Sequence, residues 1–475
     1  MNDINKNIKN LNKIFAAVFL TLILYLAYIQ FFTADRLHKL AADPRLEEDI
    51  KNRGIIYSTN LIAMAVNAQD PKDKENWIRY YPYASAAADV IGYDSLIYGK
   101  TGLEEYLNSY LLFDNKINSI FKLERFLKGE NWSGFDCVIT INENVQQKAY
   151  DSIKSHKGAA VVLNPRTGEI IALATSPSFD PNNLNAGWNN LVNNPDSPLI
   201  NRATESLYPP GSTFKVFTLS SALDSETINE SYSLNCTGSY EAGSLGAGKG
   251  KYYIQEAHGG AHGRVDYPAA LIYSCNIAFA DIALKMGPEI FLSYIKKFGL
   301  KDSISFELPV TRANFSRKDE FYMGVLAQSG FGQGDIAVTP LQMAMIVSAV
   351  ANEGKIMRPF LLKDVKDKKG GMIFVNKPGI LYNPIDKKTA DKVKNIMIDA
   401  VERGTGTAAM IDKVTVAGKT GTAENPHGKD HAWFIGFAPA DDPEVLVCVI
   451  IEGGGYGGTV AAPIAREIMI AALKK

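Results

Sequence analysis

Ser212 and Lys215 stand one helical turn apart in the segment Tyr-Pro-Pro-Gly-Ser-Thr-Phe-Lys, residues 208–215. The prolines and the glycine end any preceding element, and the mostly apolar run 212–223 predicts a helix with both side chains on one face. A serine hydroxyl attacks only when a base lies within hydrogen-bonding distance, and a buried lysine with a pKa lowered to about 7–8 can be that base. The pair predicts a serine nucleophile, although the same spacing also fits an ordinary helix cap.

A second polar motif, Ser274-Cys275-Asn276, lies between two apolar stretches with helical periodicity. A hydroxyl and an amide presented together at such a break can relay a proton and bind an amide substrate. Capping of the second helix is the alternative interpretation, and taken in isolation the motif favours that alternative.

A third motif, Lys-Thr-Gly-Thr at residues 419–422, follows the strand-like run 414–418. A nucleotide-binding loop would need glycine where Lys413 stands, so that interpretation fails. An edge strand that ends in this motif offers a cation, two hydroxyls and a close backbone approach at the glycine. Such a strand suits a substrate carboxylate and can supply an N–H group to an oxyanion.

In the order Ser-x-x-Lys, Ser-x-Asn, Lys-Thr-Gly, the three motifs resemble the signature of penicillin-recognising serine enzymes. Residues 50–470 are similar to the class B penicillin-binding proteins, monofunctional peptidoglycan D,D-transpeptidases, in their short form without added C-terminal domains. Further matches lie at 53–57, 99–104, 330–334 with Thr339-Pro340, and 431–436. The first of these departs from the family pattern at residues 58–60, where Ser-Thr-Asn replaces the usual Asp-Arg-Asn-Gly.

The resemblance implies a role for each motif residue. Ser212 would be the acylated nucleophile and Lys215 its base. Ser274 would pass a proton to the departing D-alanine, while Asn276 would hold the substrate amide and orient Lys215. The acyl-enzyme would then await the amine of a neighbouring stem peptide, and a β-lactam would trap the same serine by mimicking the D-Ala-D-Ala end.

The third motif is expected to bind the substrate terminus. Lys419 would support the electrostatics, and Thr420 and Thr422, on either side of Gly421, would bind the terminal carboxylate. The backbone N–H groups of Ser212 and Thr422 would form the oxyanion hole. No cofactor is expected, and the resemblance implies a glycan polymerase of the SEDS type as the partner protein.

The elements around these motifs predict an α+β domain. Five apolar, β-branched runs are expected to form strands, and residues 461–473 are expected to form a final helix. The five runs are 158–164, 169–175, 414–418, 432–438 and 444–451. Two strands, a long helical middle, three strands and a last helix suggest one sheet built from both ends of the domain. The resemblance implies a central antiparallel five-stranded sheet flanked by helices, as in β-lactamases, together with a mixed, β-containing pedestal.

The run 14–32 contains no charged residue, and about 20 apolar residues span a bilayer as a helix. Lys6, Lys9 and Lys13 precede it, so the positive-inside rule places the short N-terminus in the cytoplasm and the remainder outside. A cleaved signal peptide is the alternative, but residues 31–35 make a poor cleavage site. A single-pass protein of the bacterial cell membrane is expected, with an extracytoplasmic catalytic domain. The predicted parts are a tail (1–13), an anchor (14–32), a pedestal of the penicillin-binding-protein dimerisation type (33–153) and a transpeptidase domain (154–475).

The 475 residues carry 50 basic and 51 acidic side chains, a balance that argues against nucleic acid as a partner. Cys137, Cys236, Cys275 and Cys448 allow three pairings or four buried thiols. Their spacing is too wide for a zinc knuckle. Two glycines between His258 and His262 make a helical zinc pair improbable, so no metal site is expected.

Other functions share parts of this pattern. A class D-like β-lactamase or a carboxypeptidase would use the same chemistry, but the large pedestal and the anchor count against both. A β-lactam sensor should carry a cytoplasmic signalling domain, and only about 13 residues precede the predicted span. A non-catalytic scaffold would be expected to lack Ser212 or Lys215, and both are present.

Overall fold

The computed structural model describes residues 11, 13–25, 50–71, 73–74, 76–112, 133–246, 249–257, 260–315, 322–425 and 428–474. Residues 13–25 are helical with exposed side chains, and residues 26–32 of the predicted anchor lie outside the described residues. No helix among the described residues combines the length and the apolarity needed to cross a bilayer.

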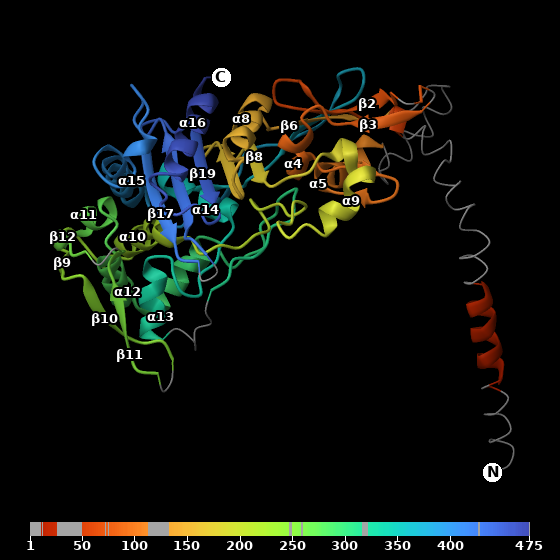
Figure 1. Cartoon of the computed structure of the whole chain (residues 1–475). Coiled ribbons are helices and arrows are strands. Elements are labelled where there is room, and N and C mark those ends of the chain that lie inside the picture. The colour runs from red at the N-terminus through yellow and green to blue at the C-terminus, as the bar shows by residue number, and fades with distance from the viewer. Residues whose placement is uncertain are drawn as a thin grey trace, which may run out of the picture.

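A five-stranded sheet forms the centre of the larger part of the molecule (Figure 1). Its strand order is β17-β18-β19-β7-β8, and all neighbouring strands are antiparallel. The strands are β7 (Gly158–Leu163), β8 (Ile170–Ser176), β17 (Ala417–Ala423), β18 (His431–Ala438) and β19 (Val445–Ile451). The predicted sheet assembled from both ends of the domain is confirmed, with the third motif on an edge strand.

Helices cover both faces of this sheet, and the two-residue period of the strands decides which side chain meets which layer. Along β7, Ala159 and Val161 pack with α10 (Lys215–Asp224) and α14 (Pro340–Ala351), whereas Ala160 and Val162 pack on the opposite face. That second layer contains α8 (Glu143–Ile153) and α16 (Ala461–Leu473). Because both faces are covered, β7, β8 and β19 are buried at every position, which explains their continuous apolar runs.

A smaller, mostly helical layer lies beside β17 (Figure 1). Its helices are α11 (Tyr267–Ile272), α12 (Asn276–Lys297), α13 (Met323–Gly330) and α15 (Lys387–Glu402). Four short strands, β9 (Ser233–Cys236), β10 (Ser239–Ser244), β11 (Lys251–Gln255) and β12 (Gly263–Asp266), pair as β10-β11 and β12-β9. The break between α11 and α12 is the position of Ser274, as the sequence predicts.

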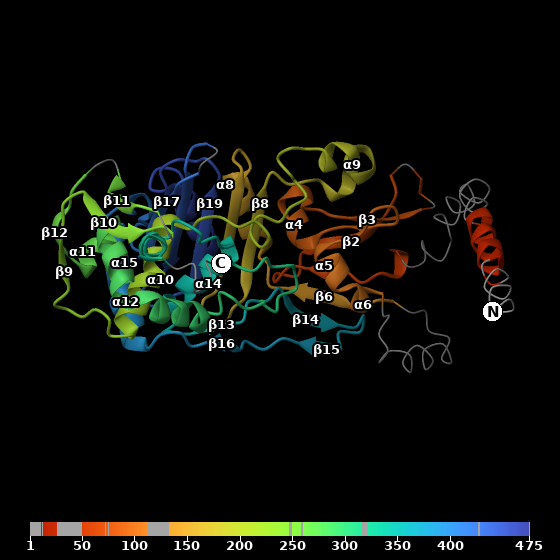
Figure 2. The ribbon, with the colours of Figure 1, turned by 90° about the horizontal axis from the view of Figure 1, so that it is seen from below.

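The N-terminal part contains a second sheet, of order β15-β14-β6-β1-β2-β3 (Figure 2). Its strands are β1 (Ile56–Tyr57), β2 (Ala63–Gln69), β3 (Trp77–Tyr80), β6 (Asp136–Ile139), β14 (Leu362–Lys366) and β15 (Met372–Val375). This sheet crosses the predicted division at residue 153, since β14 pairs with β6 from more than 200 residues earlier. Strand pairing over that separation leaves no local pattern in the sequence.

The family-like residues of the pedestal meet in one buried ion cluster. Arg53 donates to Glu104 Oε2 at 2.6 Å from its Nη2, and Arg79 donates to Glu104 Oε1 at 2.6 Å. All three side chains are buried. Gly54 is required beside them, because a Cβ there would lie 1.8 Å from the carbonyl oxygen of Phe135. The two sequence matches at 53–57 and 99–104 are therefore two halves of one packing unit.

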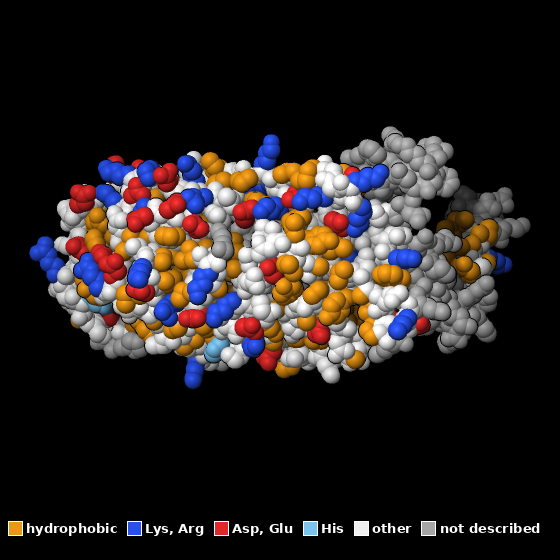
Figure 3. All heavy atoms as spheres, turned by 90° about the horizontal axis from the view of Figure 1, so that it is seen from above, with side chains coloured by type: hydrophobic (Ala, Val, Ile, Leu, Met, Phe, Trp, Pro, Cys, Tyr) orange, Lys and Arg blue, Asp and Glu red, His pale blue; other side chains and the backbone are white. Residues whose placement is uncertain are grey.

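The remaining described elements are short: α4 (Ala88–Ile91), β4 (Asp94–Ser95), β5 (Gly99–Lys100), α5 (Gly102–Tyr106), α6 (Asn108–Leu111), α9 (Leu184–Val192), β13 (Ile356–Met357) and β16 (Ile380–Tyr382). On the face drawn in Figure 3, basic and acidic side chains are interspersed over the surface. That distribution matches the near-zero net charge of the sequence.

Candidate active site

Ser212 lies in a 3₁₀ turn, η3 (Gly211–Phe214), which leads directly into α10. Gly211 has a φ of +53°, and a Cβ there would lie 2.6 Å from the carbonyl oxygen of Thr422. Its backbone N–H donates to the carbonyl of Gly332 at 2.9 Å. The turn is thus held between β17 and the segment 330–334, and only glycine allows so close an approach.

Lys215 is completely buried at the first turn of α10. Its Nζ donates to the carbonyl oxygen of Ser274 at 2.6 Å, to Ser274 Oγ at 3.1 Å and to Asn276 Oδ1 at 2.7 Å. Burial lowers the pKa of Lys215 to about 8, and the nearby negative charge of Glu256 opposes that shift. About one molecule in ten therefore has a neutral Lys215 at pH 7, and only that form can act as a general base.

Ser274 stands between two buried lysines. Its Oγ lies 3.1 Å from Lys215 Nζ and 3.0 Å from Lys419 Nζ. Ser274 has a φ of +63°, a left-handed conformation that a non-glycine residue adopts at a cost of about 1–3 kcal/mol and that is concentrated at functional sites. Burial, together with the positive charge of Lys215, lowers the pKa of Lys419 well below its ordinary value. The hydroxyl can therefore pass a proton along a chain of nitrogen and oxygen atoms.

The Lys-Thr-Gly-Thr motif lies inside β17, not after it. The predicted strand at 414–418 is wrong in its bounds, because Val414 closes a short bridge with Ile411 and the ladder begins at Ala417. Because the strand begins at Ala417, Lys419 lies inside an edge strand, and its side chain is fully buried. Thr420 and Thr422, two residues apart, share a face of the strand.

The two threonines and the glycine between them have different surroundings. Thr420 Oγ1 donates to Thr405 Oγ1 at 2.6 Å, and Thr422 Oγ1 accepts from the N–H of Gly457 at 3.4 Å. At Gly421 a Cβ would lie 2.9 Å from Thr213 Cγ2, because η3 packs directly on β17. This close packing brings the nucleophile's turn and the Lys-Thr-Gly strand together.

Comparison with known proteins agrees with this geometry. Residues 158–470 match the family model for the penicillin binding protein transpeptidase domain. The chain belongs to the penicillin-binding protein transpeptidases. Residues 53–136 of this penicillin-binding protein match the penicillin binding protein A dimerisation domain.

Two relatives match most of the chain. The peptidoglycan D,D-transpeptidase PbpA of Mycolicibacterium smegmatis is 33% identical over 98% of this chain and 99% of its own length. The peptidoglycan D,D-transpeptidase MrdA of Acinetobacter baumannii is 30% identical over 82% of this chain and 65% of its own. The imipenem acyl-enzyme complex of penicillin-binding protein A from M. tuberculosis superposes with a TM-score of 0.83, at 31% identity, over 90% of this chain and all of that one.

The structure joins four of the predicted site residues of this penicillin-binding protein directly and places the others on elements that pack against one another. Lys215, Ser274, Asn276 and Lys419 are joined by hydrogen bonds, and η3, which holds Ser212, packs on β17. Sequence reasoning missed three residues that support them: Glu256, Thr405 and Glu452. Glu256 accepts from the N–H of Ile277 at 2.9 Å, and Glu452 accepts from Tyr208 and Arg202 beneath the nucleophile's segment. A lone carboxylate in a loop gives no sequence signal for such a role.

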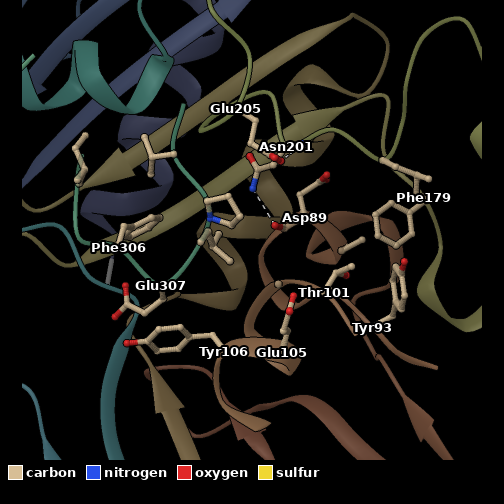
Figure 4. Close-up of a pocket in the computed structure, with 18 residues that line it drawn as sticks. Asp89, Tyr93, Thr101, Glu105, Tyr106, Phe179, Asn201, Glu205, Phe306 and Glu307 are labelled. Carbon is tan, nitrogen blue, oxygen red and sulfur yellow. Dashed lines mark hydrogen bonds between the residues drawn. The ribbon is translucent and has the colours of Figure 1, made fainter. Parts of the chain in front are cut away.

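A cavity of about 690 Å³ lies away from these motifs, where the pedestal meets the transpeptidase part (Figure 4). Asp89 and Tyr106 come from the pedestal, while Asn201 and Glu307 come from the opposite wall. Asn201 Nδ2 donates to the carbonyl oxygen of Asp89 at 2.9 Å across the seam. Burial raises the pKa of Asp89 to about 6. None of the residues that line this cavity belongs to the three motifs.

The four cysteines are buried free thiols. Two of them, Cys236 and Cys275, lie with Glu256 and His262 in one cluster whose ligating atoms are all within 4.8 Å of one another. His258, the other half of the histidine pair in the sequence, lies outside the described residues. The sequence expectation of no metal site did not foresee this cluster, because its members come from separate segments.

Proposed function

We propose that Ser212 of this peptidoglycan D,D-transpeptidase forms the acyl-enzyme through which stem peptides are crosslinked and D-alanine is released. The observation that carries the assignment is the buried chain Lys215–Ser274–Lys419, with spacings of 3.1 and 3.0 Å. It supplies a neutral base near the nucleophile and a second proton carrier for the leaving group.

The first half-reaction follows from these contacts. Lys215 takes the proton of Ser212 as its Oγ attacks the carbonyl carbon of the penultimate D-alanine, and the oxyanion is stabilised by the N–H groups of Ser212 and Thr422. The C–N bond then breaks. The departing D-alanine amine receives the proton through Ser274, which leaves an ester on Ser212.

The second half-reaction repeats the steps of the first in the opposite order, with a different amine. The amine of a neighbouring stem peptide attacks the ester carbonyl, its proton returns through Ser274 to Ser212 Oγ, and a new peptide bond crosslinks the strands. The terminal carboxylate of the donor is bound by Lys419, Thr420 and Thr422, and Asn276 holds the substrate amide. A β-lactam acylates Ser212 by the same first step, since its strained amide takes the place of the D-Ala-D-Ala bond.

The proposal extends to the setting of the enzyme. The uncharged run 14–32, preceded by three lysines, supports a single-pass anchor in the bacterial cell membrane, with residues 33–153 as pedestal and 154–475 as an extracytoplasmic transpeptidase domain. Family resemblance supports a glycan polymerase of the SEDS type as the partner, because crosslinking requires newly made glycan strands.

The test supplies the full chain with a stem pentapeptide ending in D-Ala-D-Ala and an amine acceptor, and measures free D-alanine and crosslinked product by mass spectrometry. The wild type should form both in equal amounts, Ser212→Ala should form neither, and the exposed Ser239→Ala should behave as wild type. D-alanine release without crosslinked product would mean a carboxypeptidase and contradict the proposal.

A further inference from the structure

The segment that ends in Ser212 is held at its other end by a buried hydrogen bond. Tyr208 Oη donates to Glu452 Oε1 at 2.7 Å. Tyr208 is 6% exposed, and the Glu452 side chain keeps 20% of its surface. Burial and the negative charge of Glu452 raise the pKa of Tyr208, so its phenol stays protonated and remains a donor at neutral pH. We call residues 208–212 the nucleophile strap.

The nucleophile strap is stiff. Pro209 and Pro210 have φ angles fixed by their rings, and they lack the N–H group through which a backbone could pair differently. The carbonyl oxygen of Pro209 accepts from Trp433 Nε1 at 3.1 Å, from a side chain that is completely buried. Because the two prolines cannot absorb a shift by rotation about φ, a displacement of Tyr208 is passed along the strap to Ser212.

Glu452 itself is fixed by its backbone and by two basic side chains. It follows β19 directly, and its N–H donates to the carbonyl oxygen of Lys157, just before β7, at 2.6 Å. Its Oε1 also accepts from Arg202 Nε at 3.0 Å, and its Oε2 lies 3.5 Å from Lys157 Nζ. Arg202 is 3% exposed and donates in addition to the carbonyl oxygens of Asp196 and Ser197. The carboxylate is therefore a fixed point on the central sheet.

The ring of Tyr208 is packed independently of its hydroxyl. It makes edge-to-face contacts with His431 and Trp433 of β18, at centroid separations of 5.7 and 6.1 Å. His431 Nδ1 in turn accepts from the N–H of Gly453, the residue after Glu452, at 3.2 Å. A phenylalanine at position 208 would keep the ring contacts, so the effect of the hydroxyl can be measured separately from that of the ring.

We propose that Tyr208 and Glu452 are positioning residues that hold Ser212 in place for attack. The carboxylate fixes the phenol, the phenol fixes one end of the nucleophile strap, and the other end presents the hydroxyl and the N–H group of Ser212. Both residues act through Ser212 and not on the substrate, so their effect on catalysis rests on the proposed function of Ser212. An error of about 1 Å in the position of a reacting group can lower a rate by about 100-fold.

The experiment follows acylation of the full chain by a fluorescent penicillin, under single-turnover conditions and at several penicillin concentrations. This design separates the acylation rate constant from the dissociation constant of the non-covalent complex, and the final labelled fraction reports how much of the chain is folded. Tyr208→Phe should lower the rate constant at least roughly tenfold, change the dissociation constant by less than about twofold and leave the final labelled fraction unchanged. The matched control Tyr382→Phe removes a phenol of β16 that donates to Asp302 at 2.8 Å, and it should react as the wild type does.

A second variant tests the bond from its other side. Glu452→Gln keeps the size of the side chain and an acceptor oxygen but loses the charge, so it should slow acylation by at least about threefold. Combined with Tyr208→Phe, it should slow acylation no further than Tyr208→Phe alone, because the bond is already absent. Effects that multiply would mean that Glu452 acts by another route, through Arg202, and would overturn the proposed link.

Two other results would also overturn the proposal. One is a wild-type rate constant in Tyr208→Phe, and the other is a lower final labelled fraction at an unchanged rate constant, which would show that the bond supports folding alone. Ser212→Ala should remain unlabelled. Labelling of Ser212→Ala would refute the proposed function, whereas wild-type acylation of Tyr208→Phe beside an unlabelled Ser212→Ala would refute the positioning role only.

Discussion

The buried state of Lys215 predicts how acylation depends on pH. A lysine acts as a base only when neutral, and burial lowers its pKa from 10.5 to about 8. At pH 7 roughly one molecule in ten then has a neutral Lys215, against roughly one in 3,000 for an unperturbed lysine. Burial thus increases the reactive fraction by about 300-fold. The acylation rate should rise about fivefold from pH 7 to pH 8, fall about tenfold from pH 7 to pH 6, and level off above about pH 9.

The assay follows acylation of the full chain by a fluorescent penicillin under single-turnover conditions between pH 6 and pH 10. Circular dichroism at each pH confirms that the fold is intact. A rate that varies by less than twofold between pH 6 and pH 8, or that keeps rising to pH 10, would refute the lowered pKa of Lys215. An inflection near pH 6.5 would indicate a histidine base and would contradict the assignment equally.

Two further predictions concern packing and charge. Gly421→Ala places a Cβ 2.9 Å from Thr213 Cγ2. It should lower penicillin labelling sharply and reduce the free energy of unfolding, measured by thermal unfolding, by about 1–3 kcal/mol. Gly379→Ala, with open space around the added Cβ, should retain full labelling. Glu104→Gln removes the carboxylate that accepts hydrogen bonds from both buried arginines, and should lower the free energy of unfolding by denaturant by about 3–5 kcal/mol. Glu230→Gln, at an exposed ion pair, should change it by less than about 1 kcal/mol. Equal effects of the two substitutions would contradict the buried cluster.

The sequence predicts the catalytic part of the fold well because its signals are local. Strands β7, β8, β18 and β19 are apolar runs, Pro210 stands just before the turn that leads into α10, and Ser274 lies at the break between α11 and α12. The order of the three motifs indicates a single site, although no local sequence pattern predicts that their side chains lie close together. That convergence depends on η3 packing against β17.

Features built from distant segments could not be predicted. The pairing of β14 with β6 joins residues more than 200 positions apart, and the sequence of neither strand indicates which strand it pairs with. Strand pairing and one helix cap likewise bring together Cys236, Glu256, His262 and Cys275. The spacing of the two cysteines matches no sequence motif, because the four residues are brought together by the tertiary fold and not by a single loop.

The central claim is that Ser212 is the residue acylated by the substrate and by β-lactams. The most direct measurement incubates the full chain with penicillin, digests it and locates the added mass among the peptides. We predict one long-lived adduct, on the peptide that contains Ser212, and none in Ser212→Ala. An adduct on another residue, an adduct that survives Ser212→Ala, or rapid loss of the label by hydrolysis would contradict it.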